Sequence, residues 1–368
     1  MDMSKFFAGI DLGSMNSAAV GSTALRACMP TTVGWAKDEL ARMLVGDGLL
    51  LGDKLQQNRM ALEVVRPLQD GAIKFNSPTE VEAKLKGSRE QEAVVFLLRR
   101  LLHQIDVPLG DESRCVVGVP SKASMQNRRA VLSMVQQVIP TVALVPEPFA
   151  VAFGLYPEIR HAMIIDIGAG TTDLCHYYGA FPNAEDQITI KMGGDRLDQW
   201  LLEELQSHYP QCVVNLEMVR ELKEKHASVG LANEKLLVNL PTTSSGAETF
   251  DITEILRESC QRFAAEIGKA AVELIERLDL SCRQETIGNI VLAGGGSCLT
   301  GLDALVESAC GDFGSCNVTR IHDSKFAGAD GALRLAMKLP EAGWQQLMKE
   351  TNDADSCQQP TVVEQKAA

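Results

Sequence analysis

Two short segments combine aspartate, glycine and hydroxyl residues in a pattern that suits a phosphate bound together with a metal ion. The segments read GIDLGSMNS over residues 9–17 and IDIGAGTTD over residues 165–173. Glycines lack a Cβ, so backbone N–H groups can close around an anion, and serine and threonine hydroxyls add donors. Aspartates would repel a phosphate alone, which indicates a divalent cation, usually Mg²⁺ with retained waters, between carboxylate and phosphate.

The alternative for either segment alone is a β-hairpin with a DxGxG turn that binds nothing. The repetition argues against this alternative, because Asp11 and Asp166 both follow an apolar run of strand type and precede a hydrophobic residue and a glycine. A repeat in each half of the chain predicts two similar halves that face each other across a cleft. Two such hairpins could hold a triphosphate and its metal from both sides.

A third glycine segment follows the apolar run at residues 289–293 and consists of Gly294, Gly295, Gly296 and Ser297. Consecutive glycines let the backbone lie flat against a planar ring or a sugar, although a flexible loop is the alternative. The segment is not a dinucleotide-binding fingerprint, since no GxGxxG pattern opens a helix after it. The pattern GxxxxGK[ST] does not occur, which excludes the P-loop class.

Two further sites are ambiguous from the residues alone. Glu147 lies between an apolar strand and a helix, where α/β folds place ligand groups. Its carboxylate could orient a water for attack on a γ-phosphate, or it could simply be favoured by the positive end of the helix dipole. The charged run at residues 220–225 indicates a solvated helix face with i,i+4 pairs.

Composition narrows the function classes. The 368 residues suggest two domains, and a formal net charge of −13 argues against a nucleic acid as the main partner. No segment approaches the ~18 uninterrupted apolar residues of a membrane-spanning helix, and the N-terminus leads straight into a strand, so we expect no signal peptide. The ten cysteines show neither a CxxC pair nor a zinc-binding spacing. Reduced thiols in a cytoplasm are therefore expected.

The elements that must position these residues alternate between strands and helices. Helical periodicity covers residues 90–105, 196–207, 216–229 and 252–278, and the last of these helices could contain a break. Residues 230–251 read as a β excursion, and residues 34–74 as a small insertion that leaves the first domain and returns. The alternation predicts an α/β fold.

The two Asp-Gly hairpins and the late AGGGS segment resemble the actin, sugar-kinase and heat-shock ATPase superfamily. Within it, the chain looks like the bacterial actins of the MreB type, over roughly residues 5–345, and most like those that organise magnetosome chains. The segments Arg66–Gly71 and Pro146–Phe149 are also similar. One departure is Asn127, because MreB-type proteins usually carry glutamate at this position. That departure leaves Glu147 as the main candidate for hydrolysis.

The resemblance implies an actin-like ATPase fold in which two similar α/β domains, each with a smaller subdomain, flank a nucleotide cleft. The expected division is residues 1–33, 75–149 and 320–345 for domain IA, 34–74 for subdomain IB, 150–190 and 260–319 for domain IIA, and 191–259 for subdomain IIB. Residues 346–368 are expected to form a polar C-terminal tail.

The resemblance also assigns roles to residues, with ATP and Mg²⁺ as the expected cofactors. Glu147 falls on the water-positioning acid and Asp166 on the metal-linked aspartate, and Asp11 and Asp166 would hold the metal through waters. Lys223 and Glu224 lie where related proteins contact adenosine. The expected nucleotide-binding residues are Asp11, Gly13, Ser14, Met15, Asn16, Gly168, Ala169, Gly170, Thr171, Thr172, Gly194, Asp195, Lys223, Glu224, Gly294, Gly295, Gly296 and Ser297.

The implied function is a cytoplasmic cytoskeletal ATPase that polymerises with ATP and disassembles after hydrolysis. The implied partners are further copies of the same chain and the linker proteins of magnetosomes, with no nucleic acid and no transmembrane segment. A cell-shape or plasmid-segregating filament is the alternative within the family. A small-molecule kinase on the same fold, or a membrane-tether adaptor, is the alternative outside it.

Overall fold

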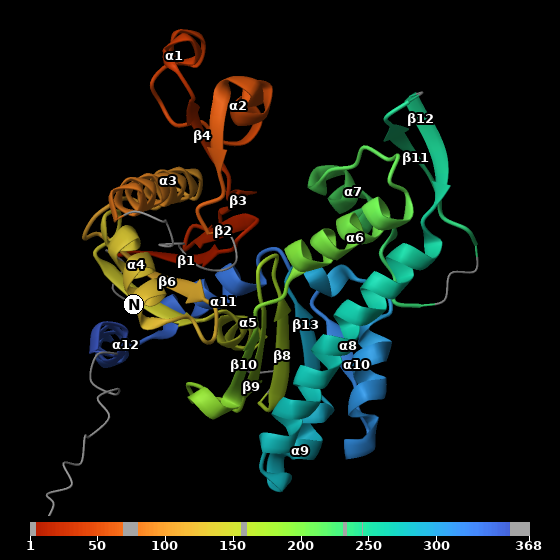
Figure 1. Cartoon of the computed structure of the whole chain (residues 1–368). Helices are drawn as coiled ribbons and strands as arrows, with labels where there is room; N and C mark the ends of the chain where they lie inside the picture. Colours follow the sequence, from red (N-terminus) through yellow and green to blue (C-terminus); the bar gives the residue numbers. More distant parts are fainter. Residues whose placement is uncertain (1–4, 69–79, 156–159, 231–233, 245, 354–368) are drawn as a thin grey trace, which may run out of the picture.

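The computed structural model describes residues 5–68, 80–155, 160–230, 234–244 and 246–353. Of the predicted segment Arg66–Gly71, the residues from 69 onward lie outside this part of the chain. Figure 1 shows two lobes side by side, each built around a sheet, with two smaller projections on the same side of the molecule.

Each lobe contains a five-stranded sheet, and the two sheets have the same topology. The strand orders are β3-β2-β1-β6-β7 and β10-β9-β8-β13-β14. In both sheets the first three strands are antiparallel neighbours and the remaining pairs are parallel. The strands are β1 (Phe6–Leu12), β2 (Asn16–Gly21), β3 (Arg26–Pro30), β6 (Ser113–Val119), β7 (Thr141–Pro146), β8 (Ala162–Ile167), β9 (Thr172–Tyr177), β10 (Gln187–Ile190), β13 (Ile290–Ala293) and β14 (Val318–Arg320). The predicted α/β class and repeated halves are confirmed.

Helices cover both sheets and join the two lobes. Their bounds are α3 (Glu80–Gln104), α4 (Met125–Gln136), α5 (Glu147–Leu155), α6 (Gly194–His208), α7 (Leu216–His226), α8 (Thr253–Arg277), α9 (Leu280–Ile287), α10 (Leu302–Cys310), α11 (Ala327–Lys338) and α12 (Glu341–Asp353). One hydrophobic cluster fills the second lobe, another fills the first, and a third joins β6 and β7 to β8 and β13 through α5, α11 and α12. The core is therefore continuous from one lobe to the other.

The smaller projections are built from short elements. In the first lobe they are β4 (Val33–Ala36), α1 (Glu39–Val45), α2 (Gly52–Gln57), a 3₁₀ turn (Arg59–Ala61) and β5 (Leu62–Val65), with β4 and β5 antiparallel. In the second lobe the hairpin of β11 (Leu237–Thr242) and β12 (Gly246–Asp251) lies beyond α6 and α7. These elements fall largely in the ranges expected for the two subdomains, whose division stays a prediction.

Helices α5 and α11 pack with their backbones in contact between the sheets. A Cβ added at Gly331 would overlap the carbonyl oxygen of Ala150, and one added at Gly9 would overlap that of Ala329. Glycine is required at both positions by this close approach. The result fixes α11 against both β1 and α5.

Two helix ends differ from the sequence predictions, and the break that was considered within residues 252–278 does not occur. Helix α7 ends at His226 rather than Val229, because Ala227 takes an extended conformation and Ser228 bridges to Thr300. Helix α8 runs from Thr253 to Arg277 without a break. Helix α12 continues to Asp353, so the chain is still packed beyond residue 346: Leu347 is buried, and the backbone N–H of Leu144 donates to Oγ1 of Thr351.

None of the helices in the described residues is both long enough and apolar enough to cross a bilayer.

Candidate functional site

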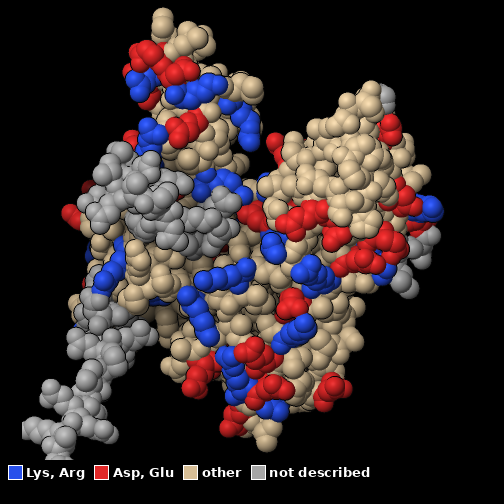
Figure 2. All heavy atoms as spheres, in the orientation of Figure 1, with Lys and Arg blue, Asp and Glu red and all other residues tan. Residues whose placement is uncertain are grey.

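A cavity of about 580 Å³ lies between the two lobes. Its walls come from both predicted hairpins, from the glycine segment after β13, from α7 and from the turn before α11. Figure 2 shows the molecule hollowed between the two projections, with lysines and arginines interspersed among acidic residues rather than gathered in one basic patch. The cavity thus occupies the position that the repeated halves predicted.

Thr31 holds the first hairpin in place through two hydrogen bonds. Its hydroxyl donates to the carbonyl of Gly13 at 2.7 Å, and its backbone N–H donates to the carbonyl of Met15 at 2.8 Å. A Cβ at Gly13 would lie 2.5 Å from the carbonyl oxygen of Asn16, so the turn requires glycine. These contacts hold the loop of residues 13–16 against the cavity.

The second hairpin closes through the bond from the N–H of Gly168 to the carbonyl of Thr171, at 2.9 Å. Its far aspartate, Asp173, is not among the residues that line the cavity. Asp173 accepts from the hydroxyls of Thr171 (2.9 Å) and Thr189 (2.5 Å) and from the N–H of Ser121 (2.8 Å). Since Ser121 follows β6, Asp173 joins the second hairpin to the first lobe.

Three half-buried carboxylates converge on the cavity: Asp11, Glu147 and Asp166. Burial raises the pKa of Asp11 to about 6. Burial, followed by the charges of Asp11 and Asp173, raises the pKa of Asp166 to about 8. Burial and the same neighbouring aspartates raise the pKa of Glu147 well above its usual range. Carboxylates that destabilise one another when ionised form a site that favours a cation, so the residues fit Mg²⁺.

Two glycines of the third segment pack tightly on the second hairpin, and the other faces open space. Gly294 has φ +73°, and a Cβ there would overlap Oδ1 of Asp166; one at Gly296 would overlap the side chain of Ile167. A Cβ at Gly295 would meet nothing within 4 Å. The segment therefore presents backbone to the cavity beside Asp166, as its parallel pairing of Ala293 with Asp166 requires.

The first turn of α6 is bonded to the second hairpin. The N–H of Gly194 donates to the carbonyl of Gly168 at 3.0 Å, and that of Asp195 donates to Ala169 at 2.8 Å. Lys223 on α7 donates to the carbonyl of Gly194 and lies 2.6 Å from Asp198. These groups line the cavity, but their amides and ammonium are already used within the protein.

Most sequence-predicted site residues line the cavity, and two do not. The hydroxyl of Thr172 donates to the carbonyl of Met192, and that of Ser297 donates to the carbonyl of Gly294, each at 2.7 Å. Both side chains support the loops instead of facing the cavity. Asn127, on α4, is also outside the cavity lining.

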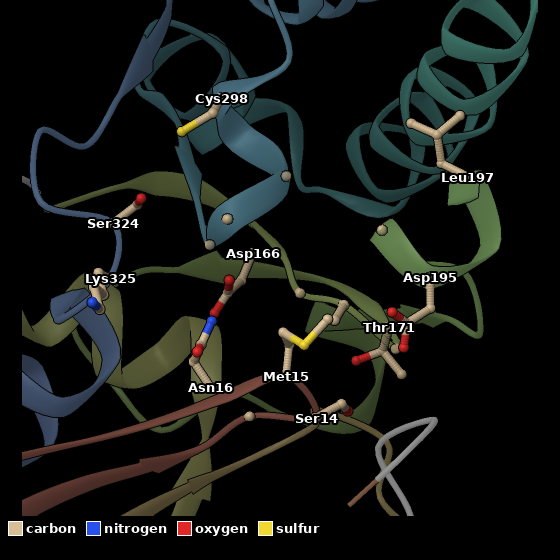
Figure 3. Close-up of a pocket in the computed structure, with 18 of the residues that line it drawn as sticks. Ser14, Met15, Asn16, Asp166, Thr171, Asp195, Leu197, Cys298, Ser324 and Lys325 are labelled. Atoms are coloured by element: carbon tan, nitrogen blue, oxygen red, sulfur yellow. The ribbon is translucent and has the colours of Figure 1, made fainter. Parts of the chain in front are cut away.

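The structure adds cavity residues that the sequence reasoning missed. They are Arg220, Cys298, Thr300, Ser324 and Lys325. Figure 3 shows the side chain of Asn16 directed at Asp166, with Lys325 and Ser324 on one side of this pair and Thr171 and Asp195 on the other. Lys325 follows β14 in a turn, and nothing in its local sequence separates it from a surface lysine.

Comparison with known proteins places this geometry in a family. The family model for MreB/Mbl protein matches residues 5–332. The chain is 33% identical to actin-like protein MamK of Paramagnetospirillum magneticum, over 93% of this chain and 95% of that protein, and 33% identical to MamK of Magnetospirillum gryphiswaldense, over 93% and 92%.

Solved structures agree with the sequence relatives. The structure of a MamK double helical filament superposes with a TM-score of 0.83 at 32% identity, covering 91% of this chain and all of that one. A non-polymerising MamK mutant bound to AMPPNP matches with a TM-score of 0.68 at 32% identity, over 91% of this chain and 99% of that one. The fold is actin-like.

Proposed function

Because the chain belongs to the MreB/Mbl family, we propose that it is an ATP-hydrolysing filament protein that organises magnetosome chains. The observation that carries the proposal is the cavity between two lobes whose sheets share one topology, lined by both Asp-Gly hairpins and by three half-buried carboxylates. The MamK structures titled as a filament and as an AMPPNP complex support polymerisation and ATP binding.

In this proposal the phosphates of ATP lie between the two hairpins, and the base lies toward Gly295 and α7. Backbone amides of residues 13–16 and 168–171 neutralise the phosphate oxygens, and positioning of this kind dominates phosphoryl transfer. Bound Mg²⁺ would supply additional charge neutralisation. Asp11 and Asp166 would hold it through waters, and its charge would let both carboxylates ionise.

Glu147 is the proposed acid that orients the attacking water. It is the first residue of α5, and Gly118 on β6 leaves the space its side chain needs, since a Cβ there would lie 3.0 Å from Cγ of Glu147. The raised pKa makes the ionised carboxylate of Glu147 a stronger base, so once it has lost its own proton it can accept a proton from the attacking water.

Closure of the lobes on ATP would favour the filament, and loss of the γ-phosphate would favour disassembly by shifting that population. The proposed partners are other copies of the chain and magnetosome-associated linker proteins, along the magnetosome chain in the cytoplasm. A cell-shape or plasmid-segregating filament would use the same cavity and differ only in cargo.

The test combines sedimentation, light scattering and phosphate release with Mg²⁺ and ATP, ADP or no nucleotide. Polymer should appear with ATP and decay as phosphate accumulates. Asp166→Ala should abolish turnover, because it removes a metal-linked carboxylate, whereas Asp312→Ala, an exposed aspartate on the second lobe, should not. Wild-type turnover in the Asp166→Ala protein would contradict the assignment. Turnover by a protein that stays monomeric would favour a phosphotransferase instead.

A further inference from the structure

A second group of side chains with metal-binding chemistry lies at the other end of the second sheet. His161 precedes β8, His176 lies on β9 and Cys282 lies on α9. One nitrogen of each imidazole and the sulfur of Cys282 all lie within 4.8 Å of one another. Strand β8 runs from Ala162 beside this group to Asp166 at the cavity, and the three residues are not part of the cavity lining.

The two imidazoles are held against each other and against α9. Their rings stack with centroids 6.1 Å apart and an interplanar angle of 23°. Nε2 of His176 lies 3.2 Å from the hydroxyl of Thr286, which itself donates to the carbonyl of Cys282 at 3.0 Å. Thr286 and Cys282 are one helical turn apart, so Nε2 of His176 is directed at the face of α9 that carries Cys282.

Each imidazole has a carboxylate beside one of its two ring nitrogens. The second ring nitrogen does not face that carboxylate. Asp186 lies 3.9 Å from Nδ1 of His176, and Glu285 lies 4.0 Å from Nε2 of His161. Nδ1 of His161 is shielded from solvent and has no hydrogen-bond partner among the residues that the structure describes. Buried polar atoms are nearly always bonded, so this nitrogen needs an explanation. A carboxylate on one side of an imidazole is the usual outer partner of a metal-bound histidine.

We propose that His161, His176 and Cys282 form a binding site for Zn²⁺ or a similar divalent transition metal, with a water in the fourth position. Two imidazoles and a thiolate are typical zinc ligands, and three protein ligands with one open position are a common tetrahedral arrangement. Zinc bonds of about 2.0–2.3 Å require the ligand atoms to approach somewhat closer than the 4.8 Å limit found here.

Charge and protonation agree with this assignment. Burial lowers the pKa of His176 against the opposing effect of the Asp186 carboxylate beside Nδ1, and a bound metal would take the place of the Thr286 hydroxyl at Nε2. Burial raises the pKa of the Cys282 thiol, and binding of a metal would displace its proton. The metal would link the residue before β8 to strand β9 and helix α9. It would stabilise the protein because it would bind the folded chain and not the unfolded chain.

The test is metal binding by the full chain, kept reduced and stripped with a chelator. Zn²⁺ competed against a chromophoric chelator should bind with one tight equivalent, and Co²⁺ should give visible bands with a thiolate-to-cobalt charge-transfer band. Cys282→Ser should abolish that band, and Cys282→Ser and His161→Ala should each weaken Zn²⁺ binding at least tenfold. Asp186→Asn should weaken it about tenfold, as loss of an outer partner does.

Matched controls separate this site from other thiols and imidazoles. Cys316→Ser and His103→Ala, which lie outside the cluster, should bind Zn²⁺ like the wild type. Zn²⁺ should raise the melting temperature of the wild type but not of Cys282→Ser, with each variant's fold checked by circular dichroism in chelator. Unchanged affinity in Cys282→Ser, or binding that Cys316→Ser also abolishes, would overturn the proposal. Both outcomes are independent of ATP hydrolysis.

Discussion

At the scale of single residues, the ionisation of Asp11, Glu147 and Asp166 controls what the cavity can bind. Desolvation raises the free energy of ionising all three, and the charge of Asp11 raises it further for Asp166 and Glu147. Without a cation, the group keeps a proton at neutral pH. A divalent cation reverses this preference because it stabilises the ionised forms.

We therefore expect binding of Mg²⁺ with nucleotide to release a proton near pH 7. Asp166, with a pKa of about 8, is mostly protonated at pH 7 and must ionise to hold the metal. Affinity should rise with pH up to about 8 and then level off, because the carboxyl is then already ionised. Calorimetry in buffers of different ionisation enthalpy measures the released protons. Asp166→Ala should reduce the release, and equal release by both proteins would refute the assignment.

Glu147→Ala should slow phosphate release while ATP binding and polymerisation persist. The reason is that its proposed role concerns only the attacking water, and the phosphates are held by other groups. Loss of one general base typically costs about 10²–10⁴-fold in rate. Single-turnover phosphate release alongside sedimentation separates the two effects. If the variant failed to bind ATP, Glu147 would instead support the cavity wall beside Gly118.

The residues of the cavity could be predicted from the sequence only where they belong to a short, recognisable sequence pattern. The hairpin and glycine segments fix their own loops, so Gly13, Asn16 and Gly168 could be placed before the fold was known. Lys325 and Ser324 reach the cavity because α11 packs on β1, a contact between distant parts of the chain. No short sequence pattern around these two residues indicates such a contact. The hairpin pattern also did not indicate that alternation along β9 turns the hydroxyl of Thr172 toward Met192.

At the scale of elements, one ion pair spans the cavity between the lobes. Arg66, which follows β5 of the first lobe, donates to the carbonyl of Ser14 at 3.1 Å and to Asp195 of α6 at 2.8 Å. The two side chains are only 20% and 18% exposed. Asp195 also accepts from Arg220 at 3.1 Å. The pair thus connects the first hairpin to the helix that supports the second.

Arg66→Met should speed nucleotide release roughly fivefold, equivalent to about 1 kcal/mol for a partly buried charged hydrogen bond. Asp195 keeps Arg220, so the substitution leaves no isolated buried charge. Stopped-flow release of a fluorescent ATP analogue measures the rate. The matched control is Arg89→Met, which breaks an exposed ion pair to Glu63 on the same lobe. Equal rates in both variants would show that the pair does not hold the lobes together.

The order and type of most elements followed from hydrophobic periodicity, and their ends followed less well. Helix α8 and the strands around both hairpins are long or strongly apolar, so their patterns suffice. The end of α7 depends on a bridge from Ser228 to Thr300. The last helix depends on Trp344, which is buried against the third cluster while Arg114 pairs with Glu341. Both are long-range contacts.

At the scale of the whole molecule, the proposed closure of the two lobes would link ATP binding to assembly. The two lobes are similar in topology and joined by a continuous core, so a neighbour that contacts both lobes would favour one relative orientation. The proposed water position beside Glu147 depends on that orientation, because the phosphates are held from both lobes. Assembly and hydrolysis are therefore expected to be coupled.

Phosphate release per molecule should rise above a threshold concentration that coincides with the appearance of polymer. Below the threshold, the lobes close only transiently and water is poorly positioned. The measurement is phosphate release over a concentration series, with sedimentation of the same samples. A rate per molecule that stays constant through the threshold would show that the monomer is already fully competent.

The backbone contact of Gly331 with Ala150 has a mechanical consequence. Two helices that touch through their backbones cannot approach further, so we expect the lobes to move at this contact mainly by rotation. The cavity lies near this pivot, while α1 and β12 lie at the far tips of the two projections (Figure 1). Each lobe then acts as a lever arm. A small displacement at the phosphates then becomes a large displacement at the tips. A neighbouring molecule that binds the tips would in turn influence how far the cavity opens.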